Sequence, residues 1–366
     1  MLSLTIAVLV ISTISGGLAA LLVLAERFIA NYGECQITIN GEKTLAAEGG
    51  RSLLETLASQ KIFIPSACGG RGTCALCKVK VLEGGGPVAP TELPLLSADE
   101  RAANVRISCQ VKVRNDIAID IPPELFSVRE YRGVVERIRD LTHDMKELGI
   151  RLVEPSEISF TAGQYVQLVA PEYKGSPEPV YRAYSVSSPP SRKDAIELII
   201  RLVPGGICTT WVFNHLKRGD EVRLNGPYGQ FGLTESDAEM IWIAGGSGMA
   251  PFWSIARDMA EKGVERKCTY FFGALTQKDL FLVDEFRELE RKMPGFKFIP
   301  ALSEPGEGGK WDGETGLITD VVGRHVEQGT VAEAYLCGSG GMIKAACKVL
   351  EAKGIPEERM FFDEFT

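Results

Sequence analysis

Histidine is scarce in this chain of 366 residues, which contains only His143, His215 and His325. Histidine-rich metal sites, and a Rieske-type centre with its two histidine ligands, are therefore poorly supported. Positive charge is also in short supply, because 40 Lys and Arg stand against 48 Asp and Glu, a formal net charge of -8. Without a broad basic surface, nucleic acid is not expected as a partner. The sequence also contains no internal repeat and no low-complexity segment.

The nine cysteines lack the pattern of a disulfide framework. Four of them share a motif described below, and the other five are scattered along the chain: Cys35, Cys208, Cys268, Cys337 and Cys347. An odd remainder of scattered thiols argues against a disulfide scaffold and for a reducing compartment.

Segment 66–77 reads SACGGRGTCALC and places Cys68, Cys74 and Cys77 within ten residues, and Cys109 follows after 31 intervening residues. Thiolates suit iron-sulfur clusters, and the three glycines of this segment let its backbone fold closely around one. The alternative is a four-cysteine zinc site, but structural zinc usually takes two separated cysteine pairs, and Cys109 has no close partner in sequence. The spacing therefore predicts a [2Fe-2S] cluster.

Long hydrophobic runs are also few, and the one that stands out is at the start of the chain. Residues 1–25 contain no charged residue before Glu26 and Arg27. This run is long enough for a helix that crosses a membrane. A secretory signal peptide is the alternative, but no basic residue precedes the run and no clear cleavage site follows it. We therefore expect a transmembrane helix over 1–27. Basic residues lie only after it, which predicts that the rest of the chain is cytoplasmic.

The remaining chain divides into three predicted domains. Residues 31–126 combine a strand, a hairpin turn at Gly41 and a helix over 51–60 with later strands over 78–82 and 106–113, which is typical of a β-grasp domain. Residues 127–232 contain many short strands separated by turns, which predicts an antiparallel barrel. Residues 233–366 alternate buried strands with helices, which predicts a parallel α/β domain.

Two motifs in the later domains have the features of nucleotide-binding sites. In the barrel, Arg182-Ala183-Tyr184-Ser185 precedes a glycine-led turn over 204–209, whose backbone amides could hold a pyrophosphate. In the α/β domain, the buried run 240–244 leads into a glycine loop over 245–251 and then a helix. Strand, glycine turn and helix N-terminus are the parts that hold a dinucleotide pyrophosphate.

These motifs, with Cys337-Gly338, resemble the ferredoxin-NADP reductase superfamily fused behind a plant-type ferredoxin domain. The order of helix, ferredoxin, flavin domain and nucleotide domain is most similar to the F subunits of the sodium-translocating NADH:quinone reductases. These subunits share the cysteine spacing, the Gly-Met-Ala-Pro loop and an acidic C-terminus ending in phenylalanine, here Asp363-Glu364-Phe365. The resemblance implies a multidomain α+β and α/β protein that binds a [2Fe-2S] cluster, FAD and NADH at the inner membrane of a bacterium, beside other integral membrane redox subunits.

The resemblance also implies roles for individual residues. Arg182 would pair with the FAD pyrophosphate, Tyr184 would pack on the isoalloxazine, and Ser185 would hydrogen-bond near flavin N5. The residues implied in cofactor binding are Arg182, Ala183, Tyr184, Ser185, Gly206, Cys208 and Thr209 for FAD, and Gly245, Gly246, Ser247, Gly248, Met249, Cys337 and Gly338 for NADH. Ser185, Cys337 and Phe365 are the expected catalytic residues, and Phe365 would cover one flavin face. Two simpler interpretations stay open, in which Cys337 is a buried thiol without a role and Phe365 is a core aromatic.

The expected function is the entry of electrons from NADH into a membrane complex that reduces quinone. An alternative is a membrane-anchored reductase that serves an oxygenase or another redox protein, since those use the same three modules. A third interpretation, from a different class, is a zinc-bound membrane adaptor without enzymatic activity. The sequence identifies neither the terminal acceptor nor any ion that is pumped.

Overall fold

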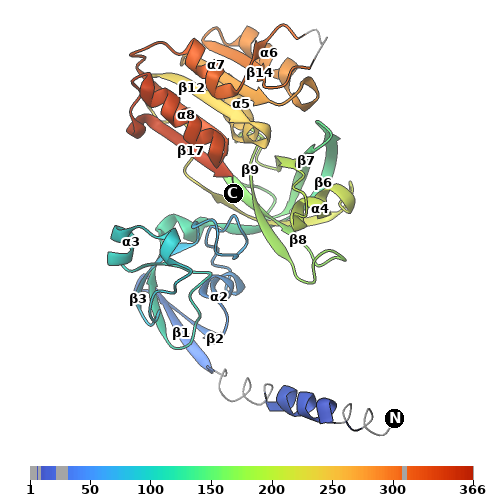
Figure 1. Cartoon of the computed structure of the whole chain (residues 1–366), viewed down its shortest axis with the longest axis vertical. Helices are drawn as coiled ribbons and strands as arrows, with labels where there is room; N and C mark the ends of the chain where they lie inside the picture. The colour runs from blue at the N-terminus through green and yellow to red at the C-terminus, as the bar shows by residue number, and fades with distance from the viewer. Residues whose placement is uncertain (1–5, 7–9, 22–31, 307–310, 366) are drawn as a thin grey trace. The chain divides into compact units, whose positions relative to one another are not determined.

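The computed structural model describes residue 6 and residues 10–21, 32–306 and 311–365 (Figure 1). The chain divides into two compact units, Met1–Pro65 with Gly70–Ser127 and Ser66–Gly69 with Val128–Thr366. Residues 10–21 are helical. Among the described residues, no helix is long and apolar enough to span a membrane. Much of the span predicted over 1–27 lies outside the described residues.

The first unit holds a five-stranded sheet in the order β2-β1-β5-β3-β4. β1 and β5 are parallel neighbours, and the other pairs are antiparallel. Its elements are β1 (Glu34–Ile39), β2 (Lys43–Glu48), α2 (Leu53–Ser59), β3 (Lys78–Glu83), α3 (Ala98–Ala102), β4 (Val105–Ile107) and β5 (Ile117–Asp120). The inward faces of the strands and of α2 form one apolar core that includes Ile37, Leu53 and Ile119.

Local chemistry explains where these elements begin and turn. Asn40 and Gly41 both have positive φ values, of 52° and 69°, as a tight hairpin turn between two twisted strands requires. Helix α2 begins after a capping box, in which the Ser52 side chain accepts from the backbone of Glu55 and the Glu55 carboxylate accepts from the backbone of Ser52. The predicted hairpin and helix are therefore present.

One predicted strand of this unit is shorter than expected. We expected a strand over 106–113, but β4 ends at Ile107 and residues 108–110 form a turn. The backbone amide of Gln110 donates to the carbonyl of Ile107 at 2.7 Å, and the amide of Ser108 donates to the carbonyl of Cys77 at 2.8 Å. This turn presents Cys109 from a loop instead of from the flat surface of a strand.

The second unit begins with a six-stranded antiparallel sheet in the order β10-β7-β6-β11-β8-β9. Its elements are β6 (Arg129–Asp140), β7 (Met145–Glu154), β8 (Tyr165–Ala170), β9 (Val180–Ser185), β10 (Ala195–Arg201), α4 (Ile207–Asn214) and β11 (Glu221–Tyr228). A bridge between Val186 and Leu198 joins the end of β9 to β10, so that the two edge strands meet as in a barrel. The interior is filled by alternate residues such as Leu148, Val166 and Ile196.

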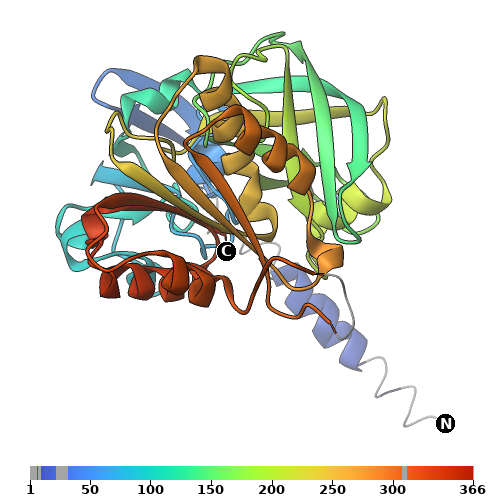
Figure 2. The same ribbon diagram turned by 90° about the horizontal axis from the view of Figure 1, so that it is seen from above.

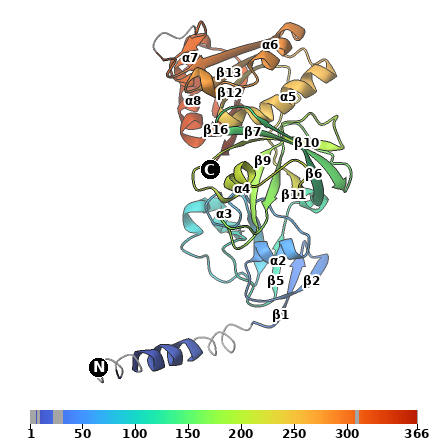
Figure 3. The same cartoon turned by 90° about the vertical axis from the view of Figure 1, so that its right-hand side faces the viewer.

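A parallel sheet follows in the order β15-β14-β13-β12-β16-β17. Its elements are β12 (Glu239–Gly245), α5 (Met249–Lys262), β13 (Cys268–Ala274), α6 (Val283–Lys292), β14 (Phe296–Leu302), β15 (Glu314–Thr315), α7 (Ile318–His325), β16 (Ala332–Ser339), α8 (Gly340–Ala352) and β17 (Met360–Phe365). Helices α5 and α6 cover one face and α7 and α8 the other, as Figures 2 and 3 show. The first face is packed with aromatic side chains, including Trp242, Tyr270 and Phe298.

The order of these strands identifies where a ligand would bind. β12 comes first in the chain but lies between β13 and β16, so the direction of strand addition reverses at β12. In open α/β sheets, ligands bind in the crevice beyond the carboxyl ends of the strands at such a reversal. Here those ends are the glycine-rich turns after Gly245 and after Gly338.

Candidate functional sites: a cysteine loop, a flavin strand and a nucleotide loop

The cysteine segment before β3 adopts an irregular loop that depends on its glycines. Gly69, Gly70 and Gly72 have φ values of 65°, 84° and 72°, a region that side chains with a Cβ rarely adopt. Ala75, between Cys74 and Cys77, also has a positive φ of 55°. These positive φ values give the segment a tightly wound backbone that larger side chains would strain.

The structure places two of the four predicted cluster ligands together, although they come from separate segments. A side-chain hydrogen bond joins Cys77 to Cys109, and this contact, together with burial, raises the pKa of the Cys77 thiol. Cys68 is buried, and Cys74 is half-buried in the same loop as Cys77. A [2Fe-2S] cluster with four cysteine ligands is held by two pairs of thiolates, so this donor set fits that group. No histidine or carboxylate is needed to complete it.

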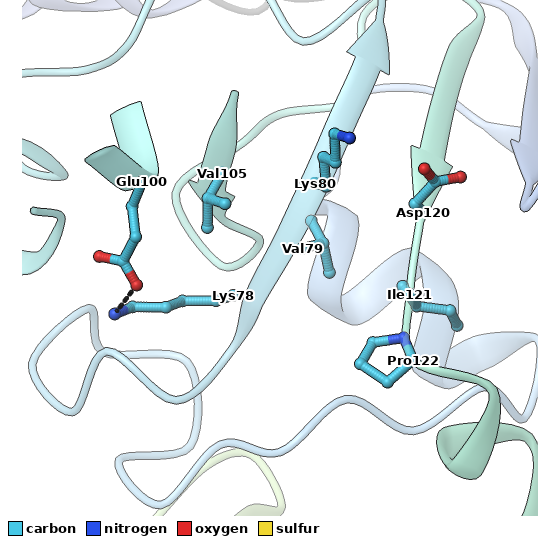
Figure 4. Close-up of a pocket in the computed structure, with 8 residues that line it drawn as sticks. All are labelled: Lys78, Val79, Lys80, Glu100, Val105, Asp120, Ile121 and Pro122. Atoms are coloured by element: carbon cyan, nitrogen blue, oxygen red, sulfur yellow. Dashed lines mark hydrogen bonds and ion pairs between the residues drawn. The ribbon is translucent and has the colours of Figure 1, made fainter. Parts of the chain in front are cut away.

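The pocket drawn in Figure 4 lies elsewhere in the same unit, over β3, β4 and β5. Lys78 and Glu100 form an ion pair at 2.6 Å on one side of it, and Asp120 and Pro122 lie on the other. None of its lining residues is a predicted site residue. The pocket therefore does not bear on cofactor binding.

The predicted flavin residues lie on β9 and at the start of α4. β9 carries Arg182, Ala183, Tyr184 and Ser185. Tyr184 and Cys208 share a side-chain hydrogen bond, and burial raises the pKa of the Cys208 thiol to about 11 and the pKa of the Tyr184 hydroxyl above its usual range. Both groups are therefore neutral hydrogen-bonding groups, and the contact fixes the Tyr184 ring beside α4.

The start of α4 has the features of an anion site. Gly206 caps the helix without a side-chain hydrogen bond, which leaves the first backbone amides of the helix without a side-chain cap. The Arg182 guanidinium is close enough to lower the pKa of the Cys208 thiol, although burial outweighs this effect. Thr209 Oγ1 contacts the amide and carbonyl of Val203, at 3.2 and 3.3 Å, and so shapes the 203–206 turn. Arg182 and the predicted phosphate turn thus lie close together.

The predicted NADH loop joins β12 to α5 and includes Gly245, Gly246, Ser247, Gly248 and Met249. Gly246 has a φ of 56°, and a Cβ on Gly248 would lie 2.2 Å from the carbonyl oxygen of Cys337. Gly338, at the end of the neighbouring strand β16, has a φ of 149°. The two glycine turns therefore pack backbone against backbone at the carboxyl ends of β12 and β16, where a side chain on Gly248 would not fit.

Two predicted catalytic residues lie at this same end of the sheet. Cys337 is fully buried in the core that faces α5 and α6, and burial raises the pKa of its thiol. Phe365, near the end of β17, is half-buried and packs against the same core, as does Phe361. The Cys337 carbonyl lies against Gly248 and so helps to shape the glycine turns, while the burial of the Cys337 side chain suits the simpler interpretation of an unreactive thiol.

The third predicted catalytic residue has a partner that sequence reasoning missed. Ser185 Oγ donates to Asp363 Oδ2 at 3.3 Å, across 178 positions of sequence. Burial raises the pKa of Asp363 to about 6, and the Ser185 hydrogen bond only partly offsets this. A pKa near neutrality makes Asp363 able to hold or release a proton beside β9. The sequence feature that could have identified Asp363 was its position between Phe361 and Phe365 on the inward face of an edge strand.

Hydrogen bonds also join helix α5 to the segment that follows β9. Helix α5 begins at the glycine loop, and its Ser254 hydroxyl donates to the carbonyl of Ser188 at 2.6 Å. Arg257 of the same helix donates to the carbonyl of Ser187 and to Glu197 Oε2, the latter at 2.7 Å. Since Ser187 and Ser188 closely follow β9, these bonds set the glycine loop relative to Ser185.

Comparisons with known domain families match the three parts of the chain. The 2Fe-2S iron-sulfur cluster binding domain matches residues 37–114, the oxidoreductase FAD-binding domain matches 132–232, and the oxidoreductase NAD-binding domain matches 242–348. The chain therefore contains binding domains for all three predicted cofactors.

Whole-chain comparisons give two groups of similar proteins. The F subunit of the Na(+)-translocating NADH-quinone reductase of Neisseria meningitidis serogroup C is 35% identical, over 95% of this chain and 96% of its own length. Its counterpart in Pseudomonas aeruginosa is also 35% identical, over 95% of each chain. Among solved structures, a cytochrome P450 reductase of Amycolatopsis has a TM-score of 0.74 and 29% identity, covering 91% of this chain and 99% of its own. The ferredoxin reductase in carbazole 1,9a-dioxygenase has a TM-score of 0.70 and 26% identity, covering 91% and 98%.

Proposed function

The chain belongs to the family of the F subunits of sodium-translocating NADH:quinone reductases, and we propose that electrons from NADH enter such a complex through it. It is an NADH-oxidising oxidoreductase with domains for NAD, FAD and a [2Fe-2S] cluster. The observation that carries the proposal is the 35% identity to these F subunits over 95% of the chain. Bound FAD supplies the step between them, since nicotinamide gives two electrons together and a [2Fe-2S] centre takes one at a time.

The flavin would be held between β9 and α4. Arg182 and the first amides of α4 would hold its pyrophosphate, by charge and by backbone donors respectively. Tyr184, fixed by its hydrogen bond to Cys208, would pack on the isoalloxazine. Ser185 at the end of β9 would then lie beside the reacting edge of the ring, and Phe365 would cover one face.

NADH would enter the crevice between the turns at Gly246 and Gly338. The α5 N-terminus favours its pyrophosphate, because backbone amides and the helix dipole both face that position. The bonds from Ser254 and Arg257 to the chain after β9 would hold the two cofactor sites in register. Hydride transfer requires such a register, since small displacements of reacting atoms cost large factors in rate.

Ser185 and Asp363 would transfer a proton at this site. With a pKa of about 6, the Asp363 carboxyl exchanges a proton near neutral pH, and Ser185 Oγ connects it to the end of β9. Hydride transfer itself needs no proton, but one proton must leave when the two electrons pass on singly, and the Ser185 hydroxyl would relay it to the Asp363 carboxylate at Oδ2. The half-buried position limits access of bulk water to the transfer.

Cys68, Cys74, Cys77 and Cys109 would ligate the cluster, and Cys109→Ala tests this arrangement. We expect the variant to lose the iron-sulfur signal while keeping FAD, because the cysteines lie in the ferredoxin domain, 37–114, and the flavin in another, 132–232. NADH should still bleach the flavin of the variant. A folded variant that loses FAD as readily as iron would contradict separate cofactor sites.

We further propose that residues 1–27 form a single membrane anchor and that the cofactor domains face the cytoplasm, beside integral membrane redox subunits. The apolar run of residues 1–25 and the relatives' role in quinone reduction support this. Deletion of residues 1–27 should give a protein that oxidises NADH with an artificial acceptor but does not sediment with membranes. Equal sedimentation of the truncated and full chains would refute the anchor.

A second candidate function is that of a reductase for an oxygenase. The Amycolatopsis cytochrome P450 reductase and the carbazole dioxygenase reductase favour it, since the fold matches both over nearly their whole length. The F subunits are the more similar in sequence, and the one from Marinomonas matches 100% of this chain. Proteins that co-purify with the chain from membranes would separate the two: quinone reductase subunits support the first function, and an oxygenase or P450 the second.

A further inference from the structure

Gln110 lies directly after the predicted cluster ligand Cys109, in the turn that ends β4. Its Nε2 donates to the Cys109 sulfur at 3.5 Å. Its Oε1 accepts from the Thr91 hydroxyl at 2.9 Å. The two ends of the amide therefore have different partners, and the Thr91 hydroxyl orients the amide so that its NH₂ group faces sulfur.

The surroundings of Gln110 hold the amide in this position. A Cβ on Gly72 would lie 2.5 Å from Gln110 Nε2, so the amide packs directly against the cysteine loop where only glycine leaves room. On the other side, Thr91 precedes Glu92, which is fully buried and forms an ion pair with Arg106 at 2.6 Å. Glu92 Oε1 also accepts from the backbone amide of Ile107 at 3.0 Å. The loop that carries Thr91 and the turn that carries Gln110 are thus fastened to each other.

We propose that Gln110 raises the reduction potential of the [2Fe-2S] cluster through its N–H···S hydrogen bond to the Cys109 ligand. The inference rests on the proposed ligand role of Cys109. Reduction adds one negative charge to the cluster and its thiolates, and a donor fixed at a ligand sulfur stabilises that charge. Hydrogen bonds to sulfur are among the factors that set cluster potentials, and outer partners of metal ligands often tune the metal. Gln110 thereby favours the arrival of electrons at the cluster.

The test is an EPR-monitored redox titration of the full chain with its cluster and FAD. Gln110→Met keeps the length of the side chain but removes the donor. We expect its equilibrium constant for one-electron reduction of the cluster to fall about tenfold, a potential lower by about 59 mV. Thr91→Val keeps the amide but removes the hydroxyl that orients it, and its potential should shift in the same direction by about half as much. The flavin potential should not change in either variant.

The matched control is Gln60→Met, which removes a glutamine of the same domain whose Nε2 contacts the carbonyl of Ala46 instead of a cysteine. It should titrate like the unmodified chain. An unshifted cluster potential in Gln110→Met would overturn the inference. If that variant does not retain a cluster, Thr91→Val decides, and an unshifted potential there overturns the inference equally.

A failure of the Gln110 inference can be distinguished from a failure of the proposed function. A full chain without a [2Fe-2S] signal, or a Cys109→Ala variant that keeps it, contradicts the ligand set itself. A normal cluster that does not respond to Gln110→Met contradicts only the role of Gln110. An independent readout is resonance Raman spectroscopy in D₂O, where exchange of the amide hydrogens should shift an iron–thiolate stretch more in the unmodified chain than in Gln110→Met.

Discussion

A buried carboxylate lies at each end of the parallel sheet, and the pKa values of the two are shifted in opposite directions. Near the start of β16, Glu333 accepts from Thr234, Arg266 and Tyr335 at 2.6 to 2.7 Å. Burial would raise its pKa, but these three donors outweigh burial and hold the pKa at about 2. Near the end of β17, the Asp363 carboxyl has the Ser185 hydroxyl as its one hydrogen-bonding partner among the described residues, and burial raises its pKa to about 6.

This difference distinguishes Glu333, which stabilises the fold, from Asp363, which is suited to proton transfer. The partners of Glu333 connect the loop before β12 to β13 and β16, so the network holds the amino end of the sheet together. Asp363 lies at the carboxyl end, where the glycine turns and the end of β9 meet. A group that is buried with few partners keeps an accessible proton at a cost in stability, and such groups cluster at functional sites.

The largest expected effect comes from removing the Arg266–Glu333 ion pair at the amino end of the parallel sheet. Arg266→Met should destabilise the protein by about 3 kcal/mol, because it leaves the Glu333 charge buried without its ion pair. Urea unfolding at pH 7.5 measures this. The double variant Arg266→Met with Glu333→Met should recover most of the loss, since replacing a buried pair by apolar side chains is often neutral. A double variant as unstable as the single one would show that the pair matters for packing instead of charge.

At the carboxyl end, the same kind of change should cost activity instead of stability. Asp363→Asn should lower NADH oxidation by roughly a hundredfold, the range of a lost general acid or base. Its thermal stability at neutral pH should equal or exceed that of the unmodified chain, because a neutral amide replaces a carboxylate that burial disfavours. Steady-state NADH oxidation with an artificial one-electron acceptor and calorimetry measure the two quantities. A variant with full activity would remove Asp363 from the mechanism.

The two carboxylates also predict opposite pH responses in the flavin-free protein. The folded-state pKa of Asp363 is raised, so its contribution to stability is present below about pH 4 and is lost as pH rises through about 6. The folded-state pKa of Glu333 is depressed, so its contribution is present above about pH 4.5 and is lost as pH falls toward 2. Each contribution is on the order of 2 kcal/mol. Urea midpoints of Asp363→Asn and Glu333→Gln from pH 3 to 8 should each lack one of these slopes, and the persistence of both slopes in both variants would contradict the assignment.

The smallest expected effect concerns the adenosine ribose, also at the carboxyl end. The segment 274–279, which begins at the last residue of β13, contains no arginine. Glu304 follows β14 beside this segment, and its backbone amide donates to the carbonyl of Leu275 at 2.8 Å. A 2′-phosphate would therefore meet little positive charge, although Lys278 is nearby. NADH should be preferred over NADPH by at least about tenfold in kcat/KM, roughly 1.4 kcal/mol. Equal values, or a preference for NADPH, would overturn this prediction.

The features that could be predicted from the sequence are those that a few neighbouring residues determine. The Gly246 turn, the Gly41 hairpin and the start of α2 were predictable because a few neighbouring residues determine their backbone. The partnership of Ser185 with Asp363 was not, since it depends on how two domains pack across 178 positions. Gln110 was expected in a strand, and only the turn at 108–110 shows that its amide faces the Cys109 sulfur.

The central claim is that electrons from NADH enter at the carboxyl end of this sheet and reach the cysteine loop through FAD within one chain. Anaerobic addition of NADH to the purified full chain, followed by absorbance and EPR in the same sample, tests it most directly. We predict bleaching of the flavin together with the appearance of a reduced [2Fe-2S] signal, and bleaching alone in Cys109→Ala. A full chain in which NADH bleaches the flavin but never reduces the cluster, or reduces the cluster without any FAD bound, would contradict the claim.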